Sequence, residues 1–127
     1  MKRKIIIMCV VLAALALLST AEQIAVSRIT DAALAQAREA IEEIRNEALI
    51  PAYDRIRQLD KAWDRQARWL ETMVDHGSTD DVRYAFSRLL AALEAGDRAT
   101  AMVYASELEG SIEHVYERQA LTLENIL

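Results

Sequence analysis

The sequence predicts an all-α protein, in which an N-terminal transmembrane or signal helix is followed by an antiparallel helical bundle of three to four helices. Three observations indicate this fold. Hydrophobic residues make up 53% of the 127 residues, which is too many for a disordered chain. Three Gly and one Pro are too few for the turns of a sheet. Apolar residues recur at spacings of three and four in four successive stretches, as on the buried face of a helix.

The N-terminus has the composition of a membrane segment. Residues 2–4 are all basic, and an unbroken apolar run extends from Ile5 to Leu18. As an anchor, residues 5–21 form roughly 25 Å of helix, and snorkelling lysines extend it toward the ~30 Å hydrocarbon core. As a signal peptide, the run has a suitable length, and the small residues Ser19 and Ala21 fit cleavage after Ala21. Both interpretations remain open at this point.

Either interpretation exports the rest of the chain, because the basic end stays cytoplasmic. We expect residues 1–21 to be a signal-anchor or signal peptide and residues 22–127 to be an extracytoplasmic helical bundle domain. The expected location is therefore the cell membrane, single-pass with the body outside, or the exterior after cleavage at Ala21. A lipoprotein is disfavoured, because the cysteine in the apolar run, Cys9, comes too early and lacks small residues before it.

The charge and the cysteine count exclude several classes of function. From Glu22 onward the chain carries 12 basic and 20 acidic residues, a formal charge of −8, which argues against nucleic acid as a partner. Cys9 is the single cysteine, so neither an intramolecular disulfide nor a cysteine-based metal site is expected.

The first helix of the bundle is predicted to continue the membrane segment as one rod, because the chain has no Gly or Pro before Pro51. Pro51 lacks an amide hydrogen and clashes with the preceding turn, so it kinks or ends this helix. We favour a tight reversal, with Pro51 at an early position of a second helix. The predicted core face of the first helix is Leu34, Ala37, Ile41, Ile44 and Ala48.

The second helix is predicted to run to about Asp75, where the chain turns. His76 and Gly77 are expected to close it, with Gly77 in the left-handed conformation. Ser78 is expected to cap a third helix, with Asp81 as the acidic partner in its first turn. The predicted core residues are Ile56, Leu59, Trp63, Ala67, Leu70 and Val74 in the second helix, and Val82, Phe86, Leu89 and Leu93 in the third.

Gly96 is expected to end the third helix, and Asp97 to cap the fourth. Gly110 falls inside the fourth helix, where glycine costs about 1 kcal/mol relative to alanine, and is expected to mark a close helix crossing. The predicted core residues of this helix are Met102, Ala105, Leu108, Ile112 and Val115.

The sequence contains no catalytic constellation and no glycine-rich phosphate loop. Metal binding requires several ligands on one face. His76, Asp80 and His114 are the weak candidates, with His76 more plausibly a helix cap and His114 a helix-surface residue. Trp63 is predicted to lie in the core, whereas Trp69, with Tyr84 or Tyr104, is either at the bundle edge or in a contact patch. The wider set of titratable candidates is Asp75, His76, Asp80, Asp81, Glu109, Glu113, His114 and Glu117.

An ordered series of short motifs gives a family resemblance. The series is Trp63, Val74-Asp75-His76, Asp80-Asp81, Arg88-Leu89 before Leu93, Gly96-Asp97, Glu107-Leu108, Ile112-Glu113-His114 and Glu124-Asn125-Ile126-Leu127. From residue 62 onward the chain resembles small bacterial proteins, known from Firmicutes, that form the domain of unknown function family numbered 4363. It departs from the pattern at Gly77, where an acidic residue is expected, and at Pro51, which replaces a polar turn. The resemblance implies a membrane segment and a helical body, and it implies no activity.

We therefore expect a non-enzymatic interaction module that is anchored in the membrane and meets another membrane or envelope protein. The alternative is a helical bundle that senses a small ligand or a metal, using the bundle interior or the regions around His76 and His114. No cofactor is expected.

Overall fold

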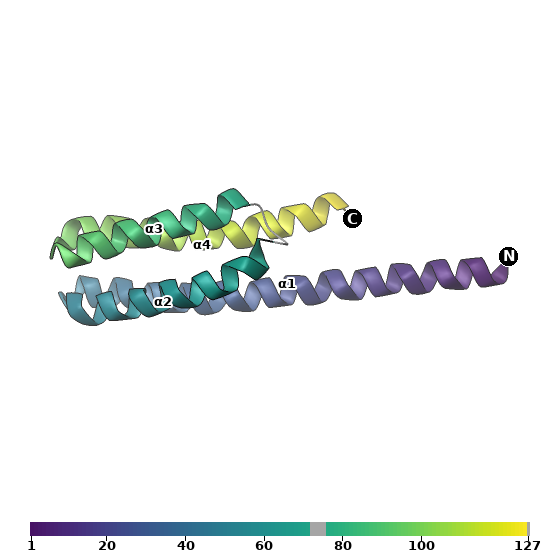
Figure 1. The fold of residues 1–127 in the computed structure, drawn as a ribbon, viewed down its shortest axis with the longest axis horizontal. Coiled ribbons are helices and arrows are strands. Elements are labelled where there is room, and N and C mark those ends of the chain that lie inside the picture. The colour runs from purple at the N-terminus through teal and green to yellow at the C-terminus, as the bar shows by residue number, and fades with distance from the viewer. Residues whose placement is uncertain (72–75, 127) are drawn as a thin grey trace.

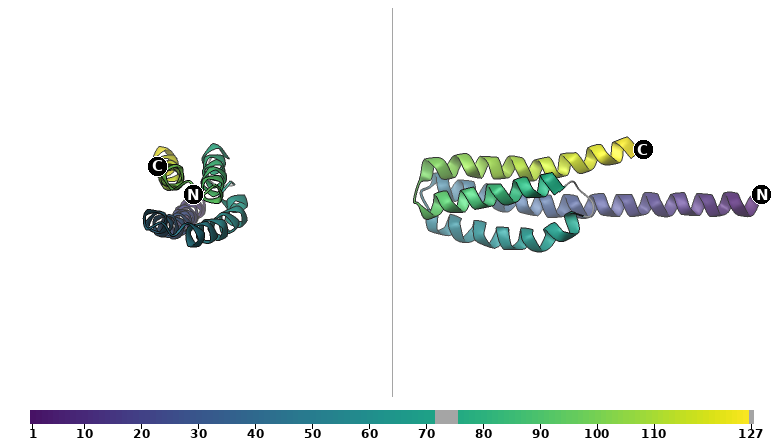
Figure 2. Two further views of the ribbon diagram at one scale, coloured as in Figure 1. Left: turned by 90° about the vertical axis from the view of Figure 1, so that its left-hand side faces the viewer. Right: turned by 45° about the horizontal axis from the view of Figure 1, so that its top comes forward.

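The structure, a computed structural model, describes residues 1–71 and 76–126, which form four α-helices and no strand. The helices are α1 (Lys2–Arg45), α2 (Leu49–Leu70), α3 (His76–Glu94) and α4 (Arg98–Ile126). They run up and down in turn, and α1 contacts both α2 and α4 while α3 contacts both α2 and α4 (Figure 1). Viewed end-on, they surround a common axis (Figure 2). The predicted all-α architecture, an apolar N-terminal helix followed by an antiparallel bundle, is confirmed.

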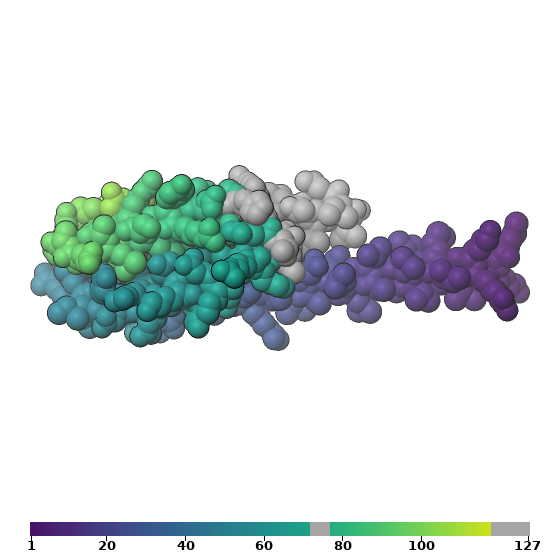
Figure 3. All heavy atoms as spheres, in the orientation of Figure 1, coloured from purple at the N-terminus to yellow at the C-terminus, as the bar shows by residue number. Residues whose placement is uncertain are grey.

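The N-terminal half of α1 projects beyond the bundle as a single helix (Figures 1 and 3). Its apolar side chains between Ile5 and Leu18 are exposed, and the first buried residue of α1 is Val26. By length and composition α1 could cross a membrane, and a signal sequence would have the same properties. The helix continues without interruption from this apolar stretch into the bundle, as the lack of Gly and Pro predicts.

The core is aliphatic and alanine-rich, with Trp63 and Phe86 as its largest side chains. Every predicted core residue that the structure describes is buried, except Ala48 and Met102, which are half-buried. The prediction at Val74 lies outside the described residues. The sequence missed several buried positions, including Thr30, whose Oγ1 donates to the carbonyls of Val26 and Ser27 at 3.0 and 3.1 Å. This self-satisfied hydroxyl lets a polar residue occupy a core position.

The first reversal precedes Pro51. Helix α1 ends at Arg45, and Glu47 adopts the left-handed conformation with φ of 62°. The amide of Ala48 donates to the Glu43 carbonyl at 2.8 Å, and that of Glu47 donates to the Ile44 carbonyl at 3.1 Å. This is a Schellman motif without its usual glycine. Pro51 is the third residue of α2, so the predicted tight reversal and the early proline position are confirmed.

The reversal after α3 has the same hydrogen bonds with a glycine in the left-handed place. Gly96 has φ of 70°, its amide donates to the Leu93 carbonyl, and the amide of Asp97 donates to the Ala92 carbonyl, both at 3.1 Å. The Asp97 side chain then accepts from the Thr100 amide at 3.1 Å and from the Thr100 hydroxyl at 2.6 Å. The predicted helix end and helix cap are both confirmed.

The connection between α2 and α3 differs from the prediction. Helix α2 ends at Leu70, earlier than the predicted Asp75, which lies outside the described residues. His76 and Gly77 begin α3 instead of closing α2, and Ser78 lies inside α3 instead of capping it. Ser78 is 2% exposed, and its hydroxyl has no hydrogen-bond partner among the described residues. The physical reason is packing. Ser78 and Val82 lie on the buried face of α3, so the helix is stabilised by including Ser78 instead of beginning after it.

Gly110 does not mark a close crossing. A Cβ added at this position would meet no atom within 4 Å, and the residue is exposed.

The two Schellman turns predict opposite effects of glycine. Gly96→Ala should lower the free energy of unfolding by about 1 kcal/mol, because a Cβ strains the left-handed conformation. Glu47→Gly should raise it by up to about 1 kcal/mol, because it removes that strain and only part of the gain is lost to unfolded-state entropy. Urea unfolding of the full chain in detergent, followed by circular dichroism, measures both. Shifts of the same sign would contradict the assigned turns.

Asp97 predicts a pH-dependent contribution to stability. Hydrogen bonds from the Thr100 side chain and amide lower the pKa of the Asp97 carboxyl from its ordinary value. A lowered folded-state pKa stabilises the fold above the unfolded-state pKa, and the gain is lost as pH falls through the folded-state pKa. Asp97→Ala should therefore lower the thermal midpoint at pH 7, and its difference from wild type should shrink below about pH 4.

Asp97→Asn is the matched control, because an amide oxygen also caps a helix but does not titrate. Its midpoint should stay near that of wild type at pH 7. An Asp97→Ala difference that is constant from pH 7 to pH 2.5 would show that the carboxylate is not the stabilising group.

Candidate functional site

A groove between α3 and α4 gathers polar and aromatic side chains on the bundle surface. Its volume is about 490 Å³. The lining residues lie at helical spacings on the two helices: Asp81, Tyr84, Ala85 and Arg88 from α3, and Glu107, Gly110, Ser111 and His114 from α4. Residues three or four apart lie on one face of a helix, so the groove follows one stripe of each.

The exposed groups of this groove are of types that protein interfaces favour. Tyr84 is 64% exposed, and the Arg88 side chain is 59% exposed. The Arg88 guanidinium reaches across the groove to Glu107, with 3.8 Å between Nη1 and Oε2. Tyrosine and arginine combine apolar area with hydrogen-bonding groups, and they are enriched at interface centres. Gly110 is an exposed residue of the groove lining, and it adds no side chain there.

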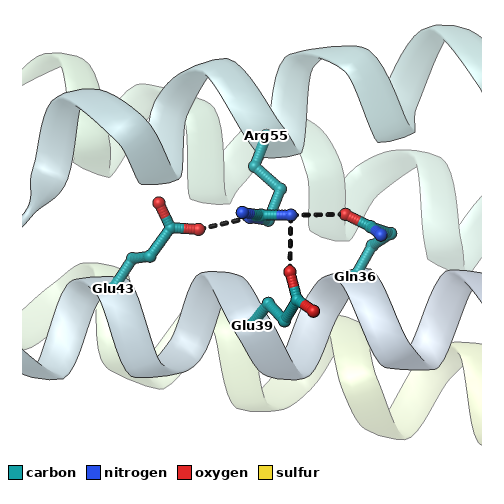
Figure 4. Close-up of polar contacts among 4 residues, drawn as sticks. All are labelled: Gln36, Glu39, Glu43 and Arg55. Atoms are coloured by element: carbon teal, nitrogen blue, oxygen red, sulfur yellow. Dashed lines mark hydrogen bonds and ion pairs between the residues drawn. The ribbon is translucent and has the colours of Figure 1, made fainter.

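The opposite side of the bundle is closed by an ionic cluster between α1 and α2 (Figure 4). The Arg55 guanidinium of α2 donates to Glu43, lies 2.7 Å from Glu39 Oε2, and donates to Gln36 Oε1 at 2.7 Å. The hydrogen bond to Glu43 is the main reason that the pKa of Arg55 is raised, so its charge is fixed across the accessible pH range. The Nε and Nη1 atoms of Arg55 both contact side-chain oxygens of α1, so this cluster ties α1 to α2.

Arginines join the other helix pairs as well. Arg38 of α1 faces Glu109 and Glu113 of α4, at 3.6 and 3.2 Å. Arg83 of α3 lies 3.6 Å from Asp64 of α2 and 3.2 Å from Glu71, the residue that follows α2. Each pair is partly exposed and contributes at most about 1 kcal/mol. Their larger effect is on the alignment of neighbouring helices, because a shift of one helix along its axis would separate the charged partners.

Arg98 connects α4 to the end of α1 in a different way. Its Nε and Nη2 donate to the carbonyls of Ile44 and Arg45 at 3.0 and 2.7 Å. Both carbonyls lie in the last turn of α1, where backbone acceptors lack helical partners and carry partial negative charge. The Arg98 side chain therefore fixes α4 to the last turn of α1 through two hydrogen bonds.

The metal-ligand candidates are spread over the bundle. His76 and Asp80 share the first turns of α3; the His76 side chain lies outside the described residues, and Asp80 is 3.8 Å from Arg83. His114 lies on α4, 3.9 Å from Glu117, and lines the α3–α4 groove. Among the described side chains, no three His, Cys, Asp or Glu residues are arranged to hold a metal ion.

The remaining titratable candidates have structural partners or lie apart. Glu109 and Glu113 do share a face, as their spacing predicts, and that face meets Arg38. Asp81 lines the α3–α4 groove, and Asp75 is outside the described residues. Asp60, which the sequence did not single out, has a raised pKa because burial and the nearby Asp64 disfavour its charged form. It belongs to the polar edge between α2 and α3.

The two tryptophans occupy different environments. Trp63 is 1% exposed, in the core as predicted, although its Nε1 has no hydrogen-bond partner within the described part of the chain. Trp69 is 38% exposed and lines a groove against α1, away from Tyr84. Tyr104 packs against the core. The predicted patch of Trp69 with Tyr84 or Tyr104 is thus not a single surface.

The comparison with protein families is decisive for identity. The family model described as Domain of unknown function (DUF4363) matches residues 21–126. The chain belongs to the DUF4363 family. No curated protein and no solved structure matches it. The DUF4363 match covers the bundle and begins where the predicted leader ends, so the resemblance drawn from the motifs is confirmed.

The sequence missed Arg88, Glu107 and Ser111 as members of the groove. Their spacing with Tyr84 and His114 places them on one stripe of each helix, which is visible in the sequence. Which stripes face each other depends on the packing of α3 against α4, and a single helical pattern does not contain that information.

Proposed function

We propose that this DUF4363 protein is a membrane-tethered, non-enzymatic interaction module whose bundle lies on the extracytoplasmic side. The observation that carries this proposal is the exposed apolar half of α1, which continues without a break into a packed bundle. An apolar helix of this length is costly in water and stable in a bilayer. The basic residues at 2–4 favour a cytoplasmic N-terminus, which directs the bundle outward.

The α3–α4 groove supports the interaction role. It offers the exposed side chains of Tyr84 and Arg88 next to Gly110, which has none, and these features suit a side chain or a helix of another membrane or envelope protein. The ion pairs of Arg38, Arg55 and Arg83 join neighbouring helices and lie outside this groove. These ion pairs stabilise the bundle, and the bundle holds the α3–α4 groove in shape.

Anchoring and orientation are tested together. The full chain should sediment with membranes after a carbonate wash, and its intact mass should include residues 1–21. Protease added to cells without an outer barrier should degrade the bundle, because the bundle is outside. A soluble full-length chain, or a bundle protected from protease until the membrane is lysed, would overturn the tether or its orientation.

Partner binding is tested by site-specific photo-crosslinking in cells. A benzoylphenylalanine in place of Tyr84 should give a discrete adduct with a membrane or envelope protein. The same probe in place of Lys61, an exposed residue of α2, should not give it. Arg88→Glu should reduce the adduct at least about tenfold, because a lost charged contact at an interface costs more than about 1.4 kcal/mol.

Gly110→Ala provides a second control on the groove. It should raise bundle stability by up to about 1 kcal/mol, since the added Cβ meets nothing and alanine favours helix. A weakened adduct in a stabilised protein would show that groove shape matters. Adducts of equal yield from positions 84 and 61 would contradict the groove as the binding surface.

A further inference from the structure

One face of α1 stays exposed from the apolar N-terminal half into the part that packs in the bundle. Its residues are spaced alternately by four and three positions, and all of them are exposed: Val10, Ala14, Leu17, Ala21, Ile24, Arg28 and Asp31. We call these residues the outer stripe. Its first five members are apolar, and its last two carry opposite charges.

The outer stripe faces away from the core of the bundle. Residues two apart in a helix point about 200° apart, which is to nearly opposite sides. The last three members of the stripe each precede a buried residue by two positions, and these buried residues are Val26, Thr30 and Ala33. Helices α2 and α4 pack on α1, and α3 packs on α2 and α4. The outer stripe therefore lies on the side of α1 opposite to the rest of the bundle.

The spacing of the outer stripe suits a second helix alongside α1. An alternation of four and three has a mean period of about 3.5 residues, which keeps a stripe facing a partner helix over several turns. Inside the apolar run every face is apolar, so the spacing discriminates only beyond Leu18. From Leu18 to Arg28 the polar side chains lie off the stripe, whereas Ala21 and Ile24 belong to it. Ile24 is 49% exposed, and the alanines at 14 and 21 allow a close approach of two helices.

At Ile24 and Arg28 the outer stripe forms a ridge between two shallow grooves. Both residues line a groove of about 550 Å³ on the side of Trp69 of α2, and both line a groove of about 250 Å³ on the side of Tyr116 of α4. In a pair of copies related by a two-fold axis parallel to α1, the ridge of each copy lies against a groove of the other. A surface with a ridge and a groove at one level is thus complementary to itself.

The charges of the outer stripe are also complementary to a second copy. Arg28 and Asp31 have opposite charges, and neither has an ion-pair partner among the described residues. In two parallel, aligned α1 helices the levels of these residues differ by about 4.5 Å, which an arginine side chain can bridge. Arg28 of each copy can therefore meet Asp31 of the other, and the symmetry produces this pair twice.

We propose that two copies of this chain dimerise through the outer stripe, with their α1 helices parallel. This inference rests on the proposed membrane tether, because the tether inserts every copy in the same direction and at the same depth. Identical stripes are then aligned residue for residue. A different protein would have to match the spacing, the grooves and the order of charges, whereas a second copy matches all three by symmetry. The α3–α4 groove stays accessible in the dimer, since α3 lies across the bundle from α1 (Figure 2).

Disulfide crosslinking in cell membranes tests the dimer. In a Cys9→Ser background, Leu17→Cys should form a species of twice the chain mass on mild oxidation. Leu15→Cys is the matched control, because Leu15 is also an exposed leucine of α1, at nearly the same depth but on the other side of the helix. Its yield should be at least about tenfold lower, since its position faces away from the partner helix. Equal yields from the two positions, no dimer from either, or an adduct of Leu17→Cys with a different protein would overturn the inference.

A charge exchange tests the alignment of the two copies. Arg28→Asp should reduce the Leu17→Cys crosslink, because it places like charges opposite each other, and adding Asp31→Arg should restore it. Both residues are exposed, so thermal unfolding of the bundle should not change. Equal crosslinking with and without these substitutions would overturn the aligned, parallel arrangement.

Flotation with vesicles separates this inference from the tether. A chain that floats but gives no stripe-specific crosslink keeps the tether and loses the dimer, whereas a chain that stays in the soluble fraction loses both. Because each dimer holds two copies, a distance within one chain is measured with the labelled chain diluted in unlabelled chain.

Discussion

The structure depends on the continuity of α1. Its C-terminal half supplies a buried face to both α2 and α4, and its N-terminal half is apolar and exposed. Because no Gly or Pro interrupts it, the same backbone hydrogen-bond ladder runs through both halves. The environment that holds the apolar half therefore also fixes the direction of the bundle. A flexible linker would let the bundle point in any direction, whereas the continuous helix does not.

Around that helix, specificity comes from a few arginines. Alanine and leucine faces pack well in more than one register, since they are small and alike. Arg38, Arg55 and Arg83 each reach carboxylates on a neighbouring helix, and Arg98 donates to two carbonyls in the last turn of α1. Individually these contacts contribute little at the surface. Together they favour one alignment of the four helices, and this alignment fixes the α3–α4 groove in place.

The sequence predicted most of the fold because helical periodicity and strong local signals agree. Asp97 caps a helix and Gly96 ends one, as their chemistry dictates, and the buried faces fall where the spacing places them. The prediction from sequence was wrong at the start of α3, where burial of a face competes with a local capping signal. Ser78 looks like a cap but is buried within α3. The α3–α4 groove depends on which helix faces meet, and the pattern of a single helix does not contain that information.

The single rod of α1 is tested most directly by one distance in the reconstituted full chain. Nitroxide labels on the native Cys9 and on a cysteine introduced by Ala35→Cys, an exposed position, are separated by 26 residues, or about 39 Å of unbroken helix. Pulsed electron resonance should give one narrow distribution near that value. A broad distribution centred well below it would mean that the helix breaks between membrane segment and bundle, and the account would be wrong.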